Sequence, residues 1–325
     1  MTMDNMINET WEDAFIEALY ERYPRRSQLI KALMKLLLLE REAVYRRLRK
    51  DVSFSMHEIV VIASAWNISL DKITGINPGQ VPFLMQPMNY ITPSEQELAF
   101  LWKIVHALHY FKNFPETEFM DICNKLPRQL LAGYQYANQF SLFKWNYQYG
   151  ESSEVVPFAQ IKVSDEKIKL DAEYFKAIQD VPNSNFIWDP KIFENFVKDV
   201  LYFHSVLLVS DKDKELIKND LHGMLDYLHD LANKGYFPES RNKVNLYISQ
   251  VNIDTNYSYT FTPEANICFI HALEKFELFT YNLQMVENFR TWMQLKKRTS
   301  IQISEVDERS RIIFFGKQRQ LVDSL

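Results

Sequence analysis

The stretch of sequence that decides the fold is Glu-Arg-Glu-Ala-Val-Tyr-Arg-Arg-Leu-Arg-Lys, residues 40–50. On a helix, Val44 and Leu48 lie one turn apart on a single face, which can be buried. A second face carries long cations around a flat phenol. The residues of this second face are Arg41, Glu42, Tyr45, Arg46 and Arg49. Guanidinium groups match phosphate oxygens and the guanine edge with paired hydrogen bonds, so this face has the side chains needed to contact nucleic acid.

The segments on either side of this stretch predict a helical hairpin followed by a third helix. Residues 28–37 carry an apolar stripe with helical spacing, made of Leu29, Leu33, Leu36 and Leu37. Residues 38–40 predict a turn between the two helices. Downstream, Ser55 and Glu58 form a capping box, which predicts that a further helix begins there.

The order of these elements over residues 25–75 resembles the helix-turn-helix domains of the Cro and phage-repressor (XRE-like) superfamily of bacterial regulators. In that family the second helix of the pair reads the major groove of DNA. The resemblance therefore implies that the DNA-reading residues are Arg41, Glu42, Tyr45, Arg46 and Arg49. Two positions depart from the family pattern, because Leu38 stands where the turn usually has a small residue and Glu40 where the helix usually opens with Ser or Thr. The alternative is a degenerate helix-turn-helix that binds a protein partner and no DNA.

Three further residues are candidates for contact with the DNA backbone. Arg25, Arg26 and Ser27 open the helix that precedes the turn. The free amides of a helix N-terminus together with nearby cations can bind a phosphate. A plain solvated helix start explains the same residues equally well.

The charge of the chain is unevenly distributed. Residues 21–50 contain ten Lys and Arg against three Glu, a net charge of +7, whereas the whole chain has −5 and the remainder therefore −12. A basic segment attached to an acidic remainder is expected when only one part of a protein meets nucleic acid. A basic patch that pairs with the chain's own acids is the alternative.

Composition argues against several other classes of protein. No apolar run approaches the ~18 residues that span a bilayer, and residues 1–5 lack the basic and apolar regions of a secretion signal. Cys123 and Cys268 lie far apart, which suits two ordinary thiols in a reducing cytoplasm. With seven glycines in 325 residues, the chain has no glycine-rich phosphate loop and no familiar hydrolase motif. We therefore expect neither an enzyme nor a bound cofactor.

Two groups of histidines have spacings compatible with a metal site. His106 and His109 are three residues apart on one expected helix, and His222, Asp226 and His229 share a face of another. We interpret both groups as ordinary helix residues, and a metal at the second group is the less favoured alternative.

The sequence predicts three parts and an α+β, mostly helical fold. Four of the twelve prolines and two of the seven glycines fall between residues 74 and 93, where no periodicity is seen. The predicted parts are an all-α helix-turn-helix domain with a leading helix (1–74), a Pro-rich linker (75–93), and an effector or dimerisation body (94–325). The body should combine helices with a small antiparallel sheet, formed by β-branched and aromatic runs at residues 244–249, 257–261 and 267–270.

The longest expected helix, capped by Ser210 and Asp213 and ending at Gly235, carries a possible pairing surface. Its apolar residues have the 4-3-4-3 spacing of a short coiled coil and are Ile217, Leu221, Met224, Leu228 and Leu231. This seam either pairs two subunits or packs within the chain.

Together these observations lead to one functional expectation. We expect a cytoplasmic, homodimeric transcriptional regulator that binds double-stranded DNA through residues 40–50, with no membrane association. Its body is expected to sense an unknown small molecule or protein effector. The alternative is a protein-interaction module that does not bind DNA.

Overall fold

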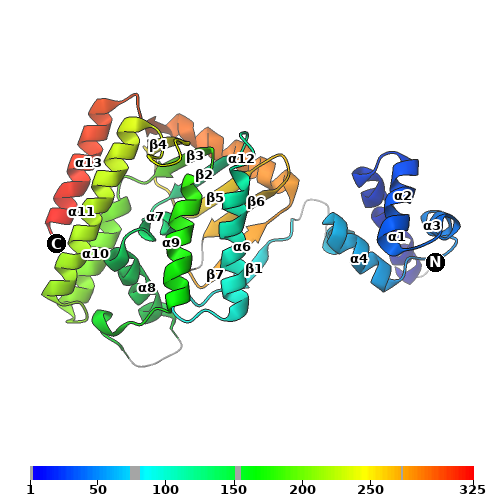
Figure 1. Ribbon diagram of the computed structural model, residues 1–325, viewed down its shortest axis with the longest axis horizontal. Helices are drawn as coiled ribbons and strands as arrows, with labels where there is room; N and C mark the ends of the chain where they lie inside the picture. Colours follow the sequence, from blue (N-terminus) through cyan, green and yellow to red (C-terminus); the bar gives the residue numbers. More distant parts are fainter. Residues whose placement is uncertain (1–2, 74–80, 151–154, 272–273) are drawn as a thin grey trace. The chain divides into compact units, whose positions relative to one another are not determined.

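The computed structural model divides the chain into two compact units, Met1–Pro82 and Phe83–Leu325, which we call the head and the body (Figure 1). The structure describes residues 3–73, 81–150, 155–271 and 274–325. Each unit encloses hydrophobic core residues of its own.

The head is built from short helices around one core. The helices are α1 (Met3–Arg22), α2 (Arg26–Leu37), α3 (Arg41–Leu48), α4 (Met56–Trp66) and α5 (Leu70–Ile73). Phe15 and Leu19 of α1, Leu29 and Leu33 of α2, and Val44 of α3 are fully buried in this core. Their helical spacing places them on the inner face of each helix, as the leucine pattern predicts.

The turn between α2 and α3 falls where the sequence predicts it. Leu38 adopts the left-handed conformation, with φ 55°, and ends α2. Glu40 is extended and precedes α3. The capping box that begins α4 is confirmed, because the Ser55 side chain accepts from the Glu58 amide and the Glu58 carboxylate accepts from the Ser55 amide.

The body contains an eight-stranded mixed sheet in the order β1-β7-β6-β5-β2-β3-β4-β8. The strands are β1 (Leu84–Pro87), β2 (Glu118–Cys123), β3 (Asn183–Trp188), β4 (Lys243–Ser249), β5 (Asn256–Phe261), β6 (Asn266–His271), β7 (Phe276–Thr280) and β8 (Ser300–Gln302). Strands β2, β3 and β4 are parallel to one another, and all the other neighbouring pairs are antiparallel.

Helices cover both faces of this sheet, most of them on one face (Figure 1). The α-helices are α6 (Glu95–Phe111), α7 (Arg128–Leu131), α8 (Gln135–Tyr149), α9 (Asp165–Gln179), α10 (Ile192–Ser205), α11 (Asp211–Lys234), α12 (Leu283–Lys296) and α13 (Glu308–Asp323), and the 3-10 helices are η1 (Phe158–Gln160) and η2 (Lys297–Thr299). Along β2, Phe119 and Cys123 join the large core beneath α6 to α11 and α13, whereas Met120 and Ile122 point to the opposite face and join Phe289 of α12. This alternation is the two-residue period of a strand.

The α+β, mostly helical fold class is confirmed, but the sheet differs from the expected small antiparallel one. Residues 244–249 belong to β4, which lies parallel to β3 and is not a neighbour of β5. The antiparallel meander consists instead of β5, β6 and β7. Strands β2 and β3, the parallel pair in the interior of the sheet, were not predicted from the sequence.

The segment expected to be a linker, residues 75–93, differs from that expectation in its second half. Residues 84–87 form β1, which pairs with β7, and the amide of Met88 donates to the carbonyl of Lys275. The chain therefore enters the body's sheet before helix α6 begins. Residues 75–80, the first part of that segment, lie outside the described residues.

Helix α11 packs within the body. The whole seam, Ile217, Leu221, Met224, Leu228 and Leu231, is buried in the large core. Of the two alternatives for this seam, packing within the chain is therefore the correct one. The capping box of Ser210 and Asp213, and the helix end at Gly235, are as the sequence predicts.

Candidate functional site

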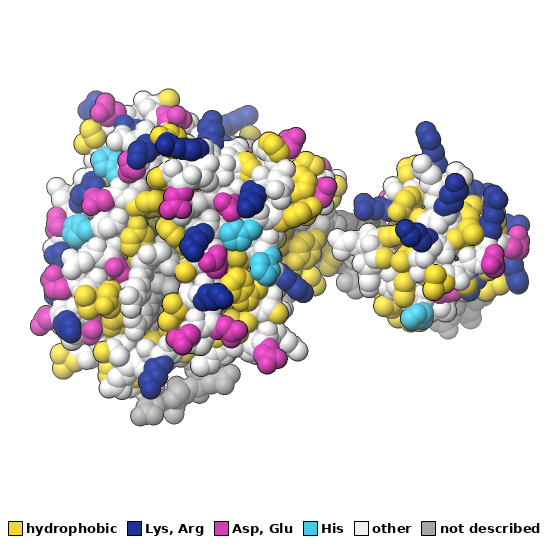
Figure 2. All heavy atoms as spheres, in the orientation of Figure 1, with side chains coloured by type: hydrophobic (Ala, Val, Ile, Leu, Met, Phe, Trp, Pro, Cys, Tyr) yellow, Lys and Arg dark blue, Asp and Glu magenta, His cyan; other side chains and the backbone are white. Residues whose placement is uncertain are grey.

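The exposed face of α3 holds the side chains that the sequence analysis selected. Val44 and Leu48 face the core, while Arg41, Glu42, Arg46 and Arg49 are exposed and Tyr45 is half-buried. The eight residues of α3 therefore have one buried side and one side presented to solvent. Figure 2 shows several Lys and Arg side chains on the visible face of the head.

Tyr45 links this face to the start of α2. The guanidinium carbon of Arg26 lies 5.4 Å from the centre of the Tyr45 ring, and that of Arg41 lies 5.5 Å from it. Nη2 of Arg41 also donates to the Tyr45 hydroxyl at 3.4 Å. Cation–π attraction of this kind orients guanidinium groups. The start of α2 and the exposed face of α3 thus form one continuous cationic surface, which we call the α2–α3 surface.

The N-terminus of α2 adds backbone donors to the α2–α3 surface. Arg25 is the N-cap residue, and its own side chain makes no capping hydrogen bond to the first-turn amides. Arg25, Arg26 and Ser27 are all exposed. Amides at a helix N-terminus beside cationic side chains are a common binding site for phosphate.

Arg47 has a different role from its neighbours. Its Nη2 lies 2.8 Å from Oε1 of Glu58, Nε donates to the other carboxylate oxygen at 3.0 Å, and Nη1 donates to the carbonyl of Ala43. Burial alone would raise the pKa of Glu58, but Arg47 and Ser55 outweigh it and lower that pKa. Arg47 therefore fixes α3 against the start of α4.

Other charges on α3 are balanced within the head. Arg49 lies 3.1 Å from both Glu42 and Asp51, and Lys50 pairs with Asp13 of α1. Arg46 is exposed and has no ionic partner among the described residues. Of the arginines that the sequence analysis placed on α3, it is therefore the most available for a phosphate or a base.

The charge of the head is zero when residues 1–82 are counted as a whole. They contain eleven Lys and Arg and eleven Asp and Glu. The head is therefore polarised rather than basic, since the surplus of cations on α2 and α3 is balanced chiefly by the acids of α1. One cation of the basic segment, Lys50, pairs with Asp13, an acid of the same chain outside that segment. The alternative interpretation of the basic segment therefore holds for this residue.

The histidine groups have ordinary partners in the body. His106 stacks on Trp102, and Nδ1 of His109 lies 2.8 Å from the Asp180 carboxylate. On α11, Nε2 of His222 lies 3.1 Å from the Asp323 carboxylate. Nη2 of Arg319 donates to Asp226 and lies 3.4 Å from Nδ1 of His229. In the described part of the chain, no group of three or more His, Cys, Asp or Glu side chains is placed to hold a metal.

The body contains a cavity of about 220 Å3. Its lining includes Cys123 at the end of β2, Lys125 and Arg128 just after β2, and Ile192 and Asn195 of α10, which follows β3. The cavity therefore adjoins the carboxyl ends of two parallel strands. In open sheets with parallel strands, ligands bind at this edge of the sheet.

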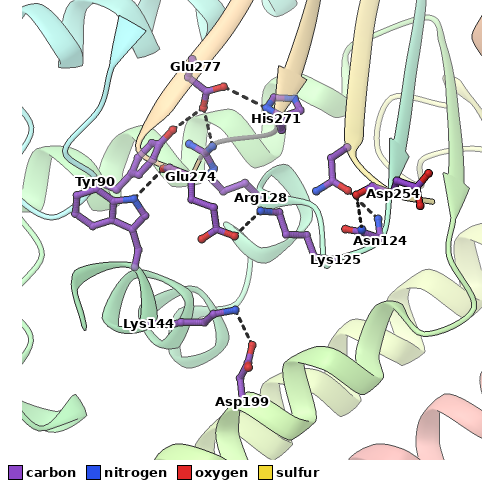
Figure 3. Close-up of polar contacts among 12 residues, drawn as sticks. Tyr90, Asn124, Lys125, Arg128, Lys144, Asp199, Asp254, His271, Glu274 and Glu277 are labelled. Carbon is purple, nitrogen blue, oxygen red and sulfur yellow. Dashed lines mark hydrogen bonds and ion pairs between the residues drawn. The ribbon is translucent and has the colours of Figure 1, made fainter. Parts of the chain in front are cut away.

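A hydrogen-bonded cluster around Glu277 forms one wall of this cavity (Figure 3). The Tyr90 hydroxyl donates to Glu277 at 2.5 Å, Nη2 of Arg128 donates at 2.7 Å, and Nδ1 of His271 lies 3.2 Å from the second carboxylate oxygen. Burial alone would raise the pKa of Glu277, but Arg128, His271 and Tyr90 outweigh it and hold that pKa well below its usual range. Glu277 therefore favours its anionic form, and its carboxylate fixes the three partners.

The cluster continues to Ser258, whose hydroxyl lies 3.1 Å from Nε2 of His271. Ser258, His271 and Glu277 thus have the hydrogen-bond order of a serine–histidine–acid triad. Two features oppose a nucleophilic role. Ser258 lies in a strand paired on both sides, and its cross-strand neighbour is the carboxylic residue Asp121, which would repel a developing oxyanion. We interpret the chain of bonds as fixing the orientation of His271.

Asp121 faces the same cavity from β2. It is buried, and one of its carboxylate oxygens accepts from Nε2 of Gln129 at 2.5 Å. Burial raises the pKa of Asp121 to about 6, and His271 and Gln129 offset part of the effect.

None of the cavity residues was predicted from the sequence to form a binding site, and Cys123 was interpreted there as an ordinary thiol. The cavity residues come from β2, β5, β6 and β7 and from α6 to α10, segments more than 100 residues apart in sequence. The local signal was weak, because β2 carries charged residues at 118 and 121 inside a fully buried strand. The single clue was the charged loop Asn-Lys-Leu-Pro-Arg, residues 124–128, directly after that strand.

Comparison with protein families, with characterised proteins and with solved structures gives no match for this chain. Among the helices that the structure describes, none is both long enough and apolar enough to cross a lipid bilayer.

Proposed function

We propose that the protein is a transcriptional regulator whose head binds double-stranded DNA through the α2–α3 surface. The observation that supports this most directly is the cluster of Arg26, Arg41 and Tyr45 together with the exposed Arg46. A helix of this size fits the major groove, where arginine reads guanine and contacts phosphates.

The two groups of residues on the α2–α3 surface have different roles in the proposal. Arg25, Arg26 and Ser27 bind a backbone phosphate at the α2 N-terminus and set the position of the head on the duplex. The exposed residues of α3 contact base edges, with Arg46 contributing most, because Arg49 is shared with Glu42 and Asp51. Arg47 contributes only by holding α3 in place.

We further propose that two copies bind DNA together. One helix of eight residues contacts few base pairs, and paired heads separated by about one helical turn supply the missing specificity. The buried seam of α11 is not the pairing surface.

The proposal is tested by fluorescence anisotropy on the full chain with DNA from its own upstream region. Arg46→Ala should weaken binding at least about tenfold, since one good arginine contact contributes ~1–3 kcal/mol to recognition. The control is Arg309→Ala, which removes the same charge from an exposed position of the body. Equal affinity of both variants would contradict the proposed surface.

A protein-binding role for the head is the second candidate. Leu38 is 90% exposed and Met56 is 70% exposed, so the head presents apolar side chains that a protein partner could cover. If the head docks a protein partner, excess random DNA should leave that complex intact, whereas a DNA-reading head would be displaced from its operator in part.

A further inference from the structure

The charged side chains that line the body's cavity are paired, with one exception. Three cations each contact one acid at 2.7 Å, in the pairs Lys125–Glu274, Arg128–Glu277 and Lys144–Asp199 (Figure 3). The remaining lining acid is Asp121, which has no basic partner in a salt bridge among the described residues. The cavity thus has an unmatched negative group.

Asp121 is built to receive a hydrogen-bond donor. Its side chain is buried at the centre of the sheet, where Gln129 holds one carboxylate oxygen. Within the described residues, the other oxygen has no hydrogen-bond partner, although the residue lines the cavity. A buried carboxylate is stabilised when a cation donates to it, because its lost hydration is then replaced.

The cavity that Asp121 lines is rich in aromatic rings. The aromatic side chains of the lining are Tyr90, Phe119, Phe140, Trp145, Tyr174, Phe196, Phe269 and Phe276. Aromatic faces attract organic cations through their quadrupoles and also bury the apolar part of a ligand. A carboxylate among aromatic rings is therefore suited to an organic cation with an apolar frame.

The two pairs Lys125–Glu274 and Lys144–Asp199 are placed to separate without unfolding the body. Their side chains are between 29% and 44% exposed, whereas Glu277 is only 7% exposed. Partly exposed ion pairs contribute little to stability and exchange readily with water. The part of the cavity lining formed by these two pairs, from α8, α10 and the loop after β2, is thus in contact with solvent.

We propose that this cavity binds a small organic amine or amidine, whose protonated nitrogen donates to Asp121 while its apolar frame lies among the aromatic side chains. We assign this ligand as the effector of the regulator, a step that rests on the proposed DNA-binding function. An anionic ligand is disfavoured, because Glu277 already neutralises Arg128 and Asp121 would repel a second anion.

Isothermal titration calorimetry on the full chain tests the cavity directly. Phenethylamine, benzamidine and a panel of related amines are each compared with a neutral compound of the same shape, such as phenethyl alcohol for phenethylamine. At least one amine should bind roughly tenfold more tightly than its neutral counterpart, as expected for a hydrogen bond between charged groups. If no amine binds, or if the neutral compounds bind equally well, the proposal is overturned.

Asp121→Asn supplies the matched variant. It keeps the size and the bond to Gln129 but removes the charge, and should lose the preference for the amine. The control Glu215→Gln removes one exposed charge from α11 and should keep that preference. An unchanged preference in Asp121→Asn would overturn the assignment of the cation site, and its melting temperature shows whether the variant is folded.

The same samples separate the cavity from the DNA-binding function. If the amine binds and shifts the DNA affinity in the wild type but not in Asp121→Asn, both proposals are supported. If the amine binds while the chain binds no DNA, the regulator proposal fails and the cavity assignment stands. If the chain binds DNA but no amine, only the cavity assignment is overturned.

Discussion

The guanidinium of Arg47 lies 2.8 Å from the carboxylate of Glu58, and the two side chains are only 17% and 12% exposed. Because Glu58 also completes the capping box of α4, this one carboxylate fixes two helices at once. The angle at which α3 presents its outer face depends on this pair.

Arg47→Ala should therefore loosen the head by about 1–2 kcal/mol, the cost of losing charge-assisted hydrogen bonds at a partly buried site. Hydrogen exchange followed by mass spectrometry should show faster exchange for peptides covering residues 41–66. Arg46→Ala is the matched control, since that side chain has no ionic partner among the described residues. Equal exchange in the two variants would show that the ion pair does not hold α3.

Glu42→Gln should strengthen binding to random DNA by a few-fold. Glu42 is exposed on the outer face of α3 and lies 3.1 Å from Arg49. Its removal frees Arg49 for phosphate and eliminates a repulsive charge, so the slope of log affinity against log salt should become steeper by about one. Anisotropy titrations at three salt concentrations measure both quantities. Weaker binding to random DNA would contradict the proposed orientation of α3.

Leu38→Gly should stabilise the head by about 0.5–1 kcal/mol. Leu38 has φ 55°, a conformation that costs a residue with a Cβ atom, and its side chain is 90% exposed, so little packing is lost. Denaturant unfolding, followed by hydrogen exchange in α2 and α3, measures the change. Leu38→Ala serves as the control, because it shortens the side chain but keeps the backbone strain. If Leu38→Gly is less stable than the wild type, the Leu38 side chain makes a contact that stabilises the head.

Asp121→Asn should raise the stability of the body at neutral pH and leave it unchanged in acid. The pKa of Asp121 is raised from 3.8 to about 6, so the folded protein holds the proton more tightly than the unfolded chain. The contribution of Asp121 to the free energy of unfolding is therefore greatest below pH ~4 and falls between pH ~4 and ~6. Above pH ~6 it is lower by roughly 2–3 kcal/mol.

The groups that set this behaviour lie on several elements around Asp121. Burial raises the pKa of Asp121, and His271 of β6 and Gln129 of α7 lower it in part. Asp121 in turn raises the pKa of Cys123 of β2 and of Tyr174 of α9. Thermal unfolding of wild type and Asp121→Asn between pH 4 and 8 tests the prediction. If the melting temperature of Asp121→Asn instead falls increasingly below that of the wild type as the pH rises, the prediction is contradicted, because Asp121 is then stabilised as an anion.

The sequence was informative where structure depends on near neighbours. The turn at Leu38 and the capping box of Ser55 and Glu58 are fixed by residues within one or two turns of helix, so spacing alone predicts them. The buried face of α3 is predicted for the same reason, because Val44 and Leu48 lie one helical turn apart.

The sheet could not be predicted in this way because its partners are distant in sequence. Glu118 pairs with Asn183 on one side and with Phe261 on the other. As a charged residue in a buried strand, Glu118 also breaks the pattern expected of β2, and it is tolerated because Arg290 of α12 pairs with it. The cavity was missed for this reason, since it exists only after β2, β5 and β7 have come together.

Local sequence leaves the start of a helix ambiguous where two capping residues are close together. Before α6 both Thr92 and Ser94 could cap the helix, and the structure has Ser94 with Glu97. Before α13, Ser304 is buried and its hydroxyl accepts from the amide of Leu246 in β4, so Asp307 caps the helix instead. A tertiary contact decided the second case, and no local rule contains it.

The salt dependence of DNA binding tests the central claim most directly. The full chain is titrated with a duplex from its own upstream region and with a random duplex, each at low and at physiological salt. The account predicts a preference for the upstream duplex that persists at physiological salt, with an affinity that falls steeply as salt rises because phosphate contacts release counterions. Equal and weak binding to both duplexes at low salt would contradict DNA recognition by the α2–α3 surface.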